Sequence, residues 1–185
     1  MQAPVVLEYR IDRDDRLVLV GGDWASFAIA NDDPDLATPD PARSIWSHVA
    51  DDGVRHLWQM LVTRARDEVP VVRVPFRCDA PAARRWFEMT LTAGADGQVD
   101  FRSELRREER RTPVAVLDRQ ASRDVALPMV RICSWCCRAH EDGRWMAIEE
   151  VVRIRDLLGL ESSPRLTHGI CDRCTETLVL EPDQA

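Results

Sequence analysis

The sequence contains two Cys-x-x-Cys pairs, and these four cysteines constrain the fold more than any other feature. The first pair reads Cys133-Ser-Trp-Cys136 and the second reads Cys171-Asp-Arg-Cys174, with 34 residues between them. Each pair brings two sulfurs together in a tight turn, and four thiolates suit a tetrahedral, soft-ligand ion such as zinc. We therefore expect Cys133, Cys136, Cys171 and Cys174 to bind one structural Zn²⁺, which leaves no open position for water or substrate.

Other interpretations of these cysteines stay open. His168, His140 or Cys137 can replace one of the four cysteines as a ligand. A redox-active dithiol is a further alternative, although no thioredoxin-type strand–helix pattern surrounds either pair. A c-type haem is excluded because Cys137 and Thr175, and not histidines, follow the two pairs. If zinc takes the four paired cysteines, we expect Cys137 to pack as a small apolar residue.

The residues between the pairs are enough for a small fold of their own. Asp142-Gly143 predicts a hairpin turn, residues 147–158 are expected to form a helix, and Gly169 is expected to make a tight turn. A last helix is expected over residues 175–178. A hairpin at the first pair and a helix at the second resemble a treble-clef zinc module, here residues 131–180. The side of the 147–158 helix expected to pack inward, or against a partner, comprises Ile148, Val151, Val152, Arg155 and Leu158.

Composition limits the partners and the compartment. All 25 basic residues are arginine, and the net charge is −7, so lysine chemistry is excluded and no nucleic-acid partner is expected. No run of about 18 apolar residues is present, so we expect no membrane contact. The first residues lack the pattern of a signal peptide. A cytoplasmic location follows, where thiols stay reduced and favour metal binding over disulfides.

The first 110 residues alternate between strand and helix patterns in a definite order. Two strands are followed by helices and then by three strands, each strand with one apolar face, which predicts an α+β fold with a five-stranded antiparallel sheet covered on one side. A loop is expected over residues 31–41, which are rich in Pro and Asp. The expected strands are 5–11, 17–20, 72–78, 87–92 and 99–106. Asp23 is expected to cap the first helix, and the long helix is expected to start at Asp51 or Asp52.

At this point the sequence resembles a PAS domain of bacterial signalling proteins. The resemblance rests on the opening hairpin, the Trp24–Phe27 helix, the Trp46-Ser-His48-Val segment before a long helix, and the final three strands. Pro75-Phe-Arg-Cys-Asp79 is similar to such regions, and so is the Cys-Ser-Trp-Cys…Thr-His-Gly-Ile-Cys-x-x-Cys tail. The resemblance implies that residues 3–110 form a PAS-like sensor or dimerisation domain. Residues 111–130 form a linker too apolar for a free tether, so we expect it to pack on one half or on a second chain.

A PAS-like domain can enclose a small-molecule ligand, but the residues responsible are unknown from sequence. The Asn-Cys-Arg-Phe-Leu-Gln motif of covalent flavin photosensors is absent, and Cys78 is expected to be a buried core thiol. A haem needs an axial ligand, and His56 lies opposite the apolar stripe of its helix, so it should face solvent. His48 is expected to make local hydrogen bonds.

No enzyme motif was found, so we expect a non-enzymatic protein. The favoured function is a cytosolic bacterial signalling or regulatory protein, a homodimer through its PAS-like domain, whose structural zinc module binds a protein partner not identified by the sequence. The first alternative is a thiol redox sensor in which oxidation releases zinc, suggested by Cys137 beside Cys136. The second is a haem or flavin PAS sensor.

Overall fold

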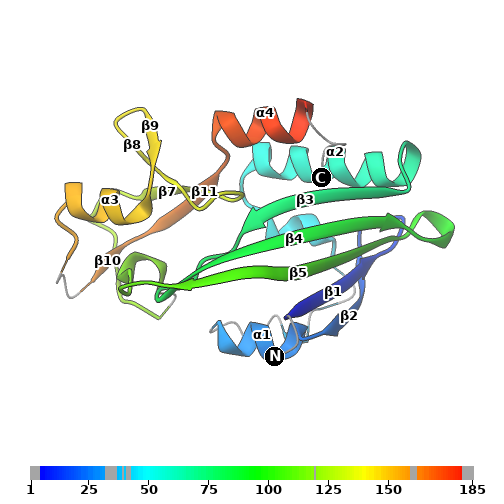
Figure 1. The fold of residues 1–185 in the computed structure, drawn as a ribbon, viewed down its shortest axis with the longest axis horizontal. Helices are drawn as coiled ribbons and strands as arrows, with labels where there is room; N and C mark the ends of the chain where they lie inside the picture. Colours follow the sequence, from blue (N-terminus) through cyan, green and yellow to red (C-terminus); the bar gives the residue numbers. More distant parts are fainter. Residues whose placement is uncertain are drawn as a thin grey trace.

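The computed structural model describes residues 5–31, 37–38, 40, 43–118, 120–158 and 162–180. Most of the loop expected over residues 31–41 lies outside these ranges. The fold is α+β, with a long five-stranded antiparallel sheet followed by a smaller sheet and two short helices (Figure 1). None of the helices in the described ranges combines the length and the apolar character that crossing a membrane requires.

The long sheet confirms the expected five antiparallel strands. Its order is β2-β1-β5-β4-β3, so the first and last strands of this half pair at its centre. Strands β3 and β4 and the first part of β5 alternate between a buried face and a polar face, as the sequence pattern predicts. The bounds are β1 Val6–Ile11, β2 Leu17–Gly22, β3 Val71–Arg77, β4 Ala83–Ala93 and β5 Val99–Arg110.

Helices cover the apolar face of this sheet. Helix α1, Trp24–Ala30, and the 3₁₀ turn η2, Ile45–His48, precede the long helix α2, Asp52–Asp67. Helix α2 starts where the sequence predicts, and the Asp51 carboxylate caps it by accepting a hydrogen bond from the Val54 amide. The predicted stripe of α2 faces the sheet, with Val54, Leu57, Leu61, Val62 and Ala65 buried.

The cap expected at α1 is different. Asp23 occupies the N-cap position, but its side chain does not cap the helix. Its carboxylate instead accepts a hydrogen bond from the Val6 amide at 2.9 Å, while the Asp23 amide donates to the Val6 carbonyl at 2.7 Å. Because these bonds tie the end of β2 to the start of β1, Asp23 stabilises the opening hairpin more than the helix.

The second half is built around a four-stranded sheet of order β11-β7-β8-β9. The β8–β9 hairpin closes on Asp142-Gly143, both with positive φ, as the Asp-Gly pair predicts. Strand β11 pairs with β7 in parallel, which the sequence did not indicate. The bounds are η4 Ala115–Leu117, β6 Arg123–Asp124, β7 Val130–Cys133, β8 Ala139–Glu141, β9 Arg144–Met146, α3 Ile148–Ile154, β10 Ser163–Pro164, β11 Leu166–Gly169 and α4 Asp172–Leu180.

Three expectations for this half differ from the structure in detail. Helix α3 ends at Ile154, not at residue 158, because Asp156 adopts a positive φ. Leu158, expected to pack inward or against a partner, is 69% exposed. Arg155, which was expected on the same packed side of the helix, forms an ion pair with Glu141 at 2.5 Å. Gly169 does not form a tight turn: it ends β11 opposite Cys133, and a Cβ there would meet the Arg131 guanidinium. The last helix starts earlier than expected, at Asp172.

Two apolar clusters hold the chain together. The larger one lies between the long sheet and α2 and also includes Cys133, Trp135 and Cys171 from the second half. The smaller one contains Val114 and Val116 of the expected linker, which pack on the second half against Val130, Ile132, Ala139, Ile148, Val151 and Val152. The linker segment is therefore part of a core, as its apolar character predicts.

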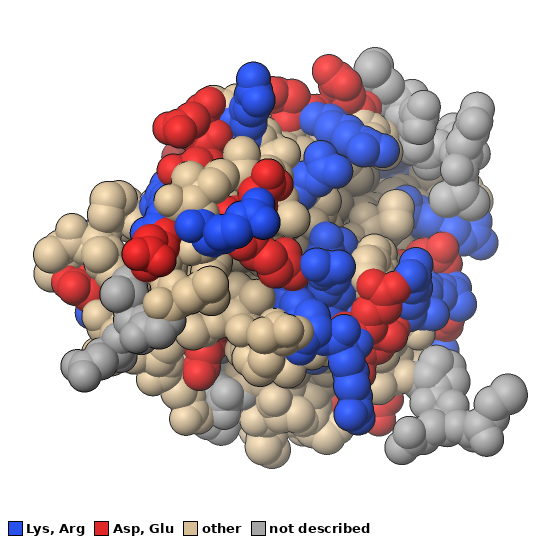
Figure 2. Space-filling model, turned by 60° about the vertical axis from the view of Figure 1, so that its left-hand side comes forward, with Lys and Arg blue, Asp and Glu red and all other residues tan. Residues whose placement is uncertain are grey.

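Charged side chains on the polar side of the long sheet pair with one another. Arg102 lies beside Glu8 and Glu104, and Arg10 pairs with Asp100 at 2.6 Å. Figure 2 shows one face of the molecule, where acidic and basic side chains are interspersed among other residues. On the face that it draws, no large area carries one sign of charge.

Candidate metal centre

The four paired cysteines meet at one point of the structure. All four Sγ atoms lie within 4.8 Å of one another, and the Sγ atoms of Cys136 and Cys171 are 3.8 Å apart. Zinc–sulfur bonds of about 2.3 Å in a tetrahedron place sulfurs about 3.8 Å apart. The donor set and its spacing therefore fit one four-thiolate metal ion, which no other group of His, Cys, Asp or Glu in the described ranges does.

The first pair sits in a tight turn after β7. The Cys137 amide donates to the Cys133 carbonyl at 3.0 Å, and the Cys133 amide donates to the Arg138 carbonyl at 2.8 Å. Cys137 takes a positive φ of 54° and so turns the chain back into β8. These bonds hold the sulfurs of Cys133 and Cys136 on one side of the turn.

The second pair lies at the start of α4. Cys171 comes just before the helix, and Cys174 lies in its first turn. The Cys171 amide donates to the Cys133 sulfur and the Cys174 amide to the Cys171 sulfur, both at 3.4 Å. Amide donors and a helix N-terminus both favour thiolate over thiol, so this environment supports metal binding.

Parallel pairing of β7 with β11 brings the two pairs together. Cys133 lies opposite Gly169 in the ladder, and the Ser134 amide donates to the Gly169 carbonyl at 2.8 Å. The chain then needs only Ile170 to reach Cys171. The convergence of cysteines far apart in sequence thus follows from strand register and does not depend on the cysteines alone.

The four thiols share protons unevenly when no cation is bound. Hydrogen bonds from the Cys136 and Cys174 side chains lower the pKa of Cys133 far below its usual value. The hydrogen bond with Cys133 raises the pKa of Cys136 to about 11, and the same partner raises that of Cys174. Four neighbouring thiolates repel one another, so full deprotonation needs a cation at their centre.

The alternative ligands lie outside the four-sulfur group. The Cys137 thiol donates to the Arg77 carbonyl at 3.3 Å, and burial raises its pKa to about 12. The His140 ring packs edge-on against Trp145, with centroids 5.1 Å apart. His168 lies on β11 with its side chain exposed. Cys137 is therefore partly buried beside the first cysteine pair, consistent with the small packed residue that the sequence predicts.

The four-cysteine cluster packs directly on the long sheet and α2. Trp135, between Cys133 and Cys136, is 4% exposed, and its carbonyl accepts a hydrogen bond from the Arg77 amide at 2.7 Å. Its ring stacks on Trp58 of α2. Sequence reasoning missed this contact; the only signal was a tryptophan inside a Cys-x-x-Cys turn, which is too large to stay exposed without cost.

A second junction between the halves is ionic. The Arg111 guanidinium lies 3.2 Å from the Asp79 carboxylate and 2.9 Å from that of Glu149 on α3. Arg84 also reaches Glu149, at 2.7 Å, and Arg77 pairs with Asp79 at 2.5 Å. Partial burial alone would raise the pKa of Glu149, but the hydrogen bonds from Arg84 and Arg111 lower it overall.

The remaining residues considered from sequence do not join the centre. His56 is exposed on α2, as predicted, and His48 is exposed in η2. Cys78 follows β3 and is partly buried; desolvation raises its thiol pKa. Comparison with known proteins found no matching family model, no matching curated protein and no matching solved structure.

Proposed function

We propose that Cys133, Cys136, Cys171 and Cys174 hold one structural Zn²⁺. The observation that carries this proposal is the convergence of the four sulfurs within 4.8 Å. When bound, zinc supplies positive charge and four directed bonds, and a closed site of this kind performs no catalysis. The chain positions the sulfurs through β7, β11 and the start of α4. The turn after β7, the β8–β9 hairpin and the helix at the second pair support a treble-clef-like module.

The protein as a whole is proposed to be a bacterial signalling or regulatory protein of the cytoplasm. The order β2-β1-β5-β4-β3, with helices inserted between β2 and β3 on one face, supports a PAS-like assignment for residues 3–110. Zinc would then fix the second half against this domain through Trp135, so that both halves move as one unit. A change sensed at one half would reach the other through packed contacts instead of a flexible tether.

A protein-binding role for the second half is supported by exposed apolar side chains. Val125, Met129, Ile154 and Leu158 are between 50% and 73% exposed. The Arg155 side chain donates to the Met129 carbonyl at 3.1 Å, so the loop before β7 lies beside the end of α3. Exposed apolar groups gathered in one region are typical of surfaces that a partner covers.

Elemental analysis combined with chelation tests the zinc proposal. Protein purified without added metal is expected to contain one zinc per chain and to lose near-ultraviolet circular dichroism when a strong chelator removes it. Re-addition of Zn²⁺ to reduced protein should restore the signal. Fully folded protein without metal would contradict the proposal, since the four sulfurs would then need no cation.

Redox sensing at the same cysteines is the second candidate function. The observation that favours it is the proximity of the four sulfurs, because thiolates this close form disulfides readily once zinc is lost. Mild peroxide with a zinc-responsive dye distinguishes the two functions. Zinc release at concentrations that oxidise ordinary thiols would support sensing, and retention of zinc would support a structural role alone.

Two further expectations need only simple measurements. A haem or flavin sensor would absorb visible light, so a colourless purified protein containing zinc would contradict that alternative.

The proposed homodimer through residues 3–110 can be checked by light scattering of the full chain. A mass of two chains supports it, and a single-chain mass at high concentration contradicts it.

A further inference from the structure

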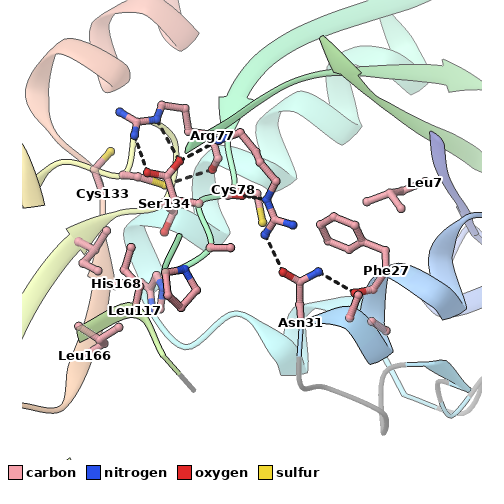
Figure 3. Close-up of a pocket in the computed structure, with 18 of the residues that line it drawn as sticks. Leu7, Phe27, Asn31, Arg77, Cys78, Leu117, Cys133, Ser134, Leu166 and His168 are labelled. Carbon is pink, nitrogen blue, oxygen red and sulfur yellow. Dashed lines mark hydrogen bonds and ion pairs between the residues drawn. The ribbon is translucent and has the colours of Figure 1, made fainter. Parts of the chain in front are cut away.

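A cavity of about 860 Å³ lies between the two halves of the molecule. One wall comes from α1, a second from the end of β3 with the residues after it, and a third from the cysteine-bearing half, as Figure 3 shows. Cys133 and Ser134 of the first cysteine turn belong to the third wall. The cavity thus lies outside the core between the long sheet and α2, and its volume is typical of sites for small molecules.

Positive charge dominates the polar lining. Among the lining residues that the structure describes, Arg77, Arg85, Arg123 and Arg165 carry positive charge and Asp79 alone is acidic, in a chain whose net charge is −7. The Asp79 carboxylate is already shared by Arg77 and Arg111. An acidic protein that gathers arginines around one cavity creates a local field that attracts anions.

Arg85 is the residue on which this inference mainly depends. It is 8% exposed, and its guanidinium donates to the Cys78 carbonyl at 2.7 Å and to the Asn31 side-chain oxygen at 2.6 Å (Figure 3). It also lies over the Phe27 ring, 4.8 Å from its centroid. All of these partners are neutral, and in the described part of the chain no carboxylate forms an ion pair with Arg85. A buried cation without an anion carries a desolvation cost that a bound anion offsets.

Two other arginines of the cavity, one partly buried and one exposed, also lack an ion pair within the described ranges. The Arg123 guanidinium donates to the carbonyls of Val116 and Pro164, at 3.1 and 3.0 Å, and to that of Asp118. Arg165 is exposed. Neither forms an ion pair with any carboxylate of the described ranges, so within that part of the chain both guanidinium groups add positive charge to the cavity.

The rest of the lining is mainly apolar. Phe27 and Leu7 lie on the α1 side, and Leu117 and Leu166 lie on the opposite side, as Figure 3 shows. Apolar walls around a few convergent charged groups favour a ligand with an apolar body and one charged end. A guanidinium fork matches both carboxylate and phosphate oxygens.

We propose that this cavity binds a small organic anion, with its carboxylate or phosphate group at Arg85 and its apolar body between Phe27 and Leu117. The inference names the ligand class for the sensing role proposed above and rests on that role. Because the ligand would contact α1, the segment after β3 and the first cysteine turn together, binding would stabilise the two halves against each other.

Fluorescence titration of the full, zinc-loaded chain tests the proposal. The probe is 8-anilinonaphthalene-1-sulfonate, an anion with apolar rings, and its neutral match is N-phenyl-1-naphthylamine, which lacks the sulfonate. We expect one saturable site for the anion and weaker binding of the neutral amine. Decanoate or decyl phosphate should displace the probe, and their relative strength separates carboxylate from phosphate recognition. Decanol should not compete because it lacks the charged group, and inorganic phosphate should not compete because it lacks the apolar body.

Three variants and one control locate the site. Arg85→Gln and Arg165→Gln each remove a charge, and the first is expected to weaken probe binding about tenfold or more. Ala30→Trp adds an indole at a lining position and should block binding. If Arg85→Gln does not fold, the other two variants decide the matter. Arg153→Gln, 73% exposed at its side chain on α3, is the control and should bind normally.

Unchanged probe affinity in folded Arg165→Gln and Ala30→Trp would overturn the proposal, and so would equal binding of the neutral amine. Zinc is measured on the same samples, which separates the two proposals. Probe binding at the expected site in a protein without zinc would overturn the metal centre and keep the ligand site. A zinc-loaded protein with no saturable probe binding would overturn the ligand site and keep the metal centre.

Discussion

The rings of Trp58 and Trp135 stack with centroids 4.8 Å apart and planes inclined by 27°. Trp58 belongs to α2 against the long sheet, whereas Trp135 lies inside the first cysteine pair. The contact therefore joins the core of the first half to the metal centre of the second. It also predicts that stability of the sheet domain and retention of zinc depend on each other.

Replacement of Trp58 tests this dependence. Trp58→Ala should destabilise the protein by about 3 kcal/mol, because a large stacked side chain is lost, and it should speed zinc transfer to a chelator. Urea unfolding and a chelator assay measure the two effects. Met60→Ala on the exposed side of the same helix is the control, expected within about 0.5 kcal/mol of the unchanged protein. Equal behaviour of the two variants would show that the stack does not link the halves.

Single cysteine substitutions test the ligand set. Serine at 133, 136, 171 or 174 should reduce zinc below one per chain and unfold the second half, because three thiolates leave the site open. Cys137→Ala should keep its zinc, since the Cys137 sulfur lies outside the group and donates to the Arg77 carbonyl. Zinc content and near-ultraviolet circular dichroism report both results. Loss of zinc in Cys137→Ala would assign that thiol to the metal.

The ionic junction at Glu149 predicts a pH effect. Glu149 has a pKa below its ordinary value of 4.5 in the folded protein, so its contribution is present above pH 4.5 and is lost as pH falls through the lowered pKa. Glu149→Gln should cost about 1–2 kcal/mol near neutral pH and should make stability less dependent on pH below 4.5. Glu150→Gln, the exposed neighbour, is the control. Parallel stability curves for Glu149→Gln and the unchanged protein would contradict the assignment.

The segment after β5 is predicted to contribute to folding stability. Val116 is 2% exposed in the smaller apolar cluster, whereas Val125 is 73% exposed. Val116→Ala should cost about 2 kcal/mol through the cavity it leaves, and Val125→Ala should change the free energy of unfolding by less than about 0.5 kcal/mol. Urea denaturation compares the two. Equal costs would mean that residues 111–130 act as a tether.

Sequence patterns predicted the parts of the fold that depend on local periodicity. The alternation in β3, β4 and β5 marks one buried face for each strand, and the Asp51 cap and the Asp142-Gly143 turn follow from local hydrogen bonding and positive φ. The four cysteines could be named in advance because their spacing reflects the geometry of metal binding. The contacts that pack around the four cysteines could not be predicted from these local patterns.

Parallel pairing of β7 with β11 escaped prediction because both strands have only four residues and no clear alternation. Gly169 was assigned to a turn, yet its missing side chain leaves space for Arg131, a contact that spacing in sequence does not reveal. The Trp58–Trp135 stack and the cavity around Arg85 likewise depend on how distant segments pack. Local patterns therefore identified the four clustered cysteines but not the surfaces around them.

X-ray absorption at the zinc edge tests the central claim most directly, because it counts the atoms bound to the metal. The account predicts one zinc per chain with four sulfur neighbours at about 2.3 Å and no lighter atom in the coordination shell. A shell containing nitrogen or oxygen, or only two or three sulfurs, would contradict a closed four-cysteine centre.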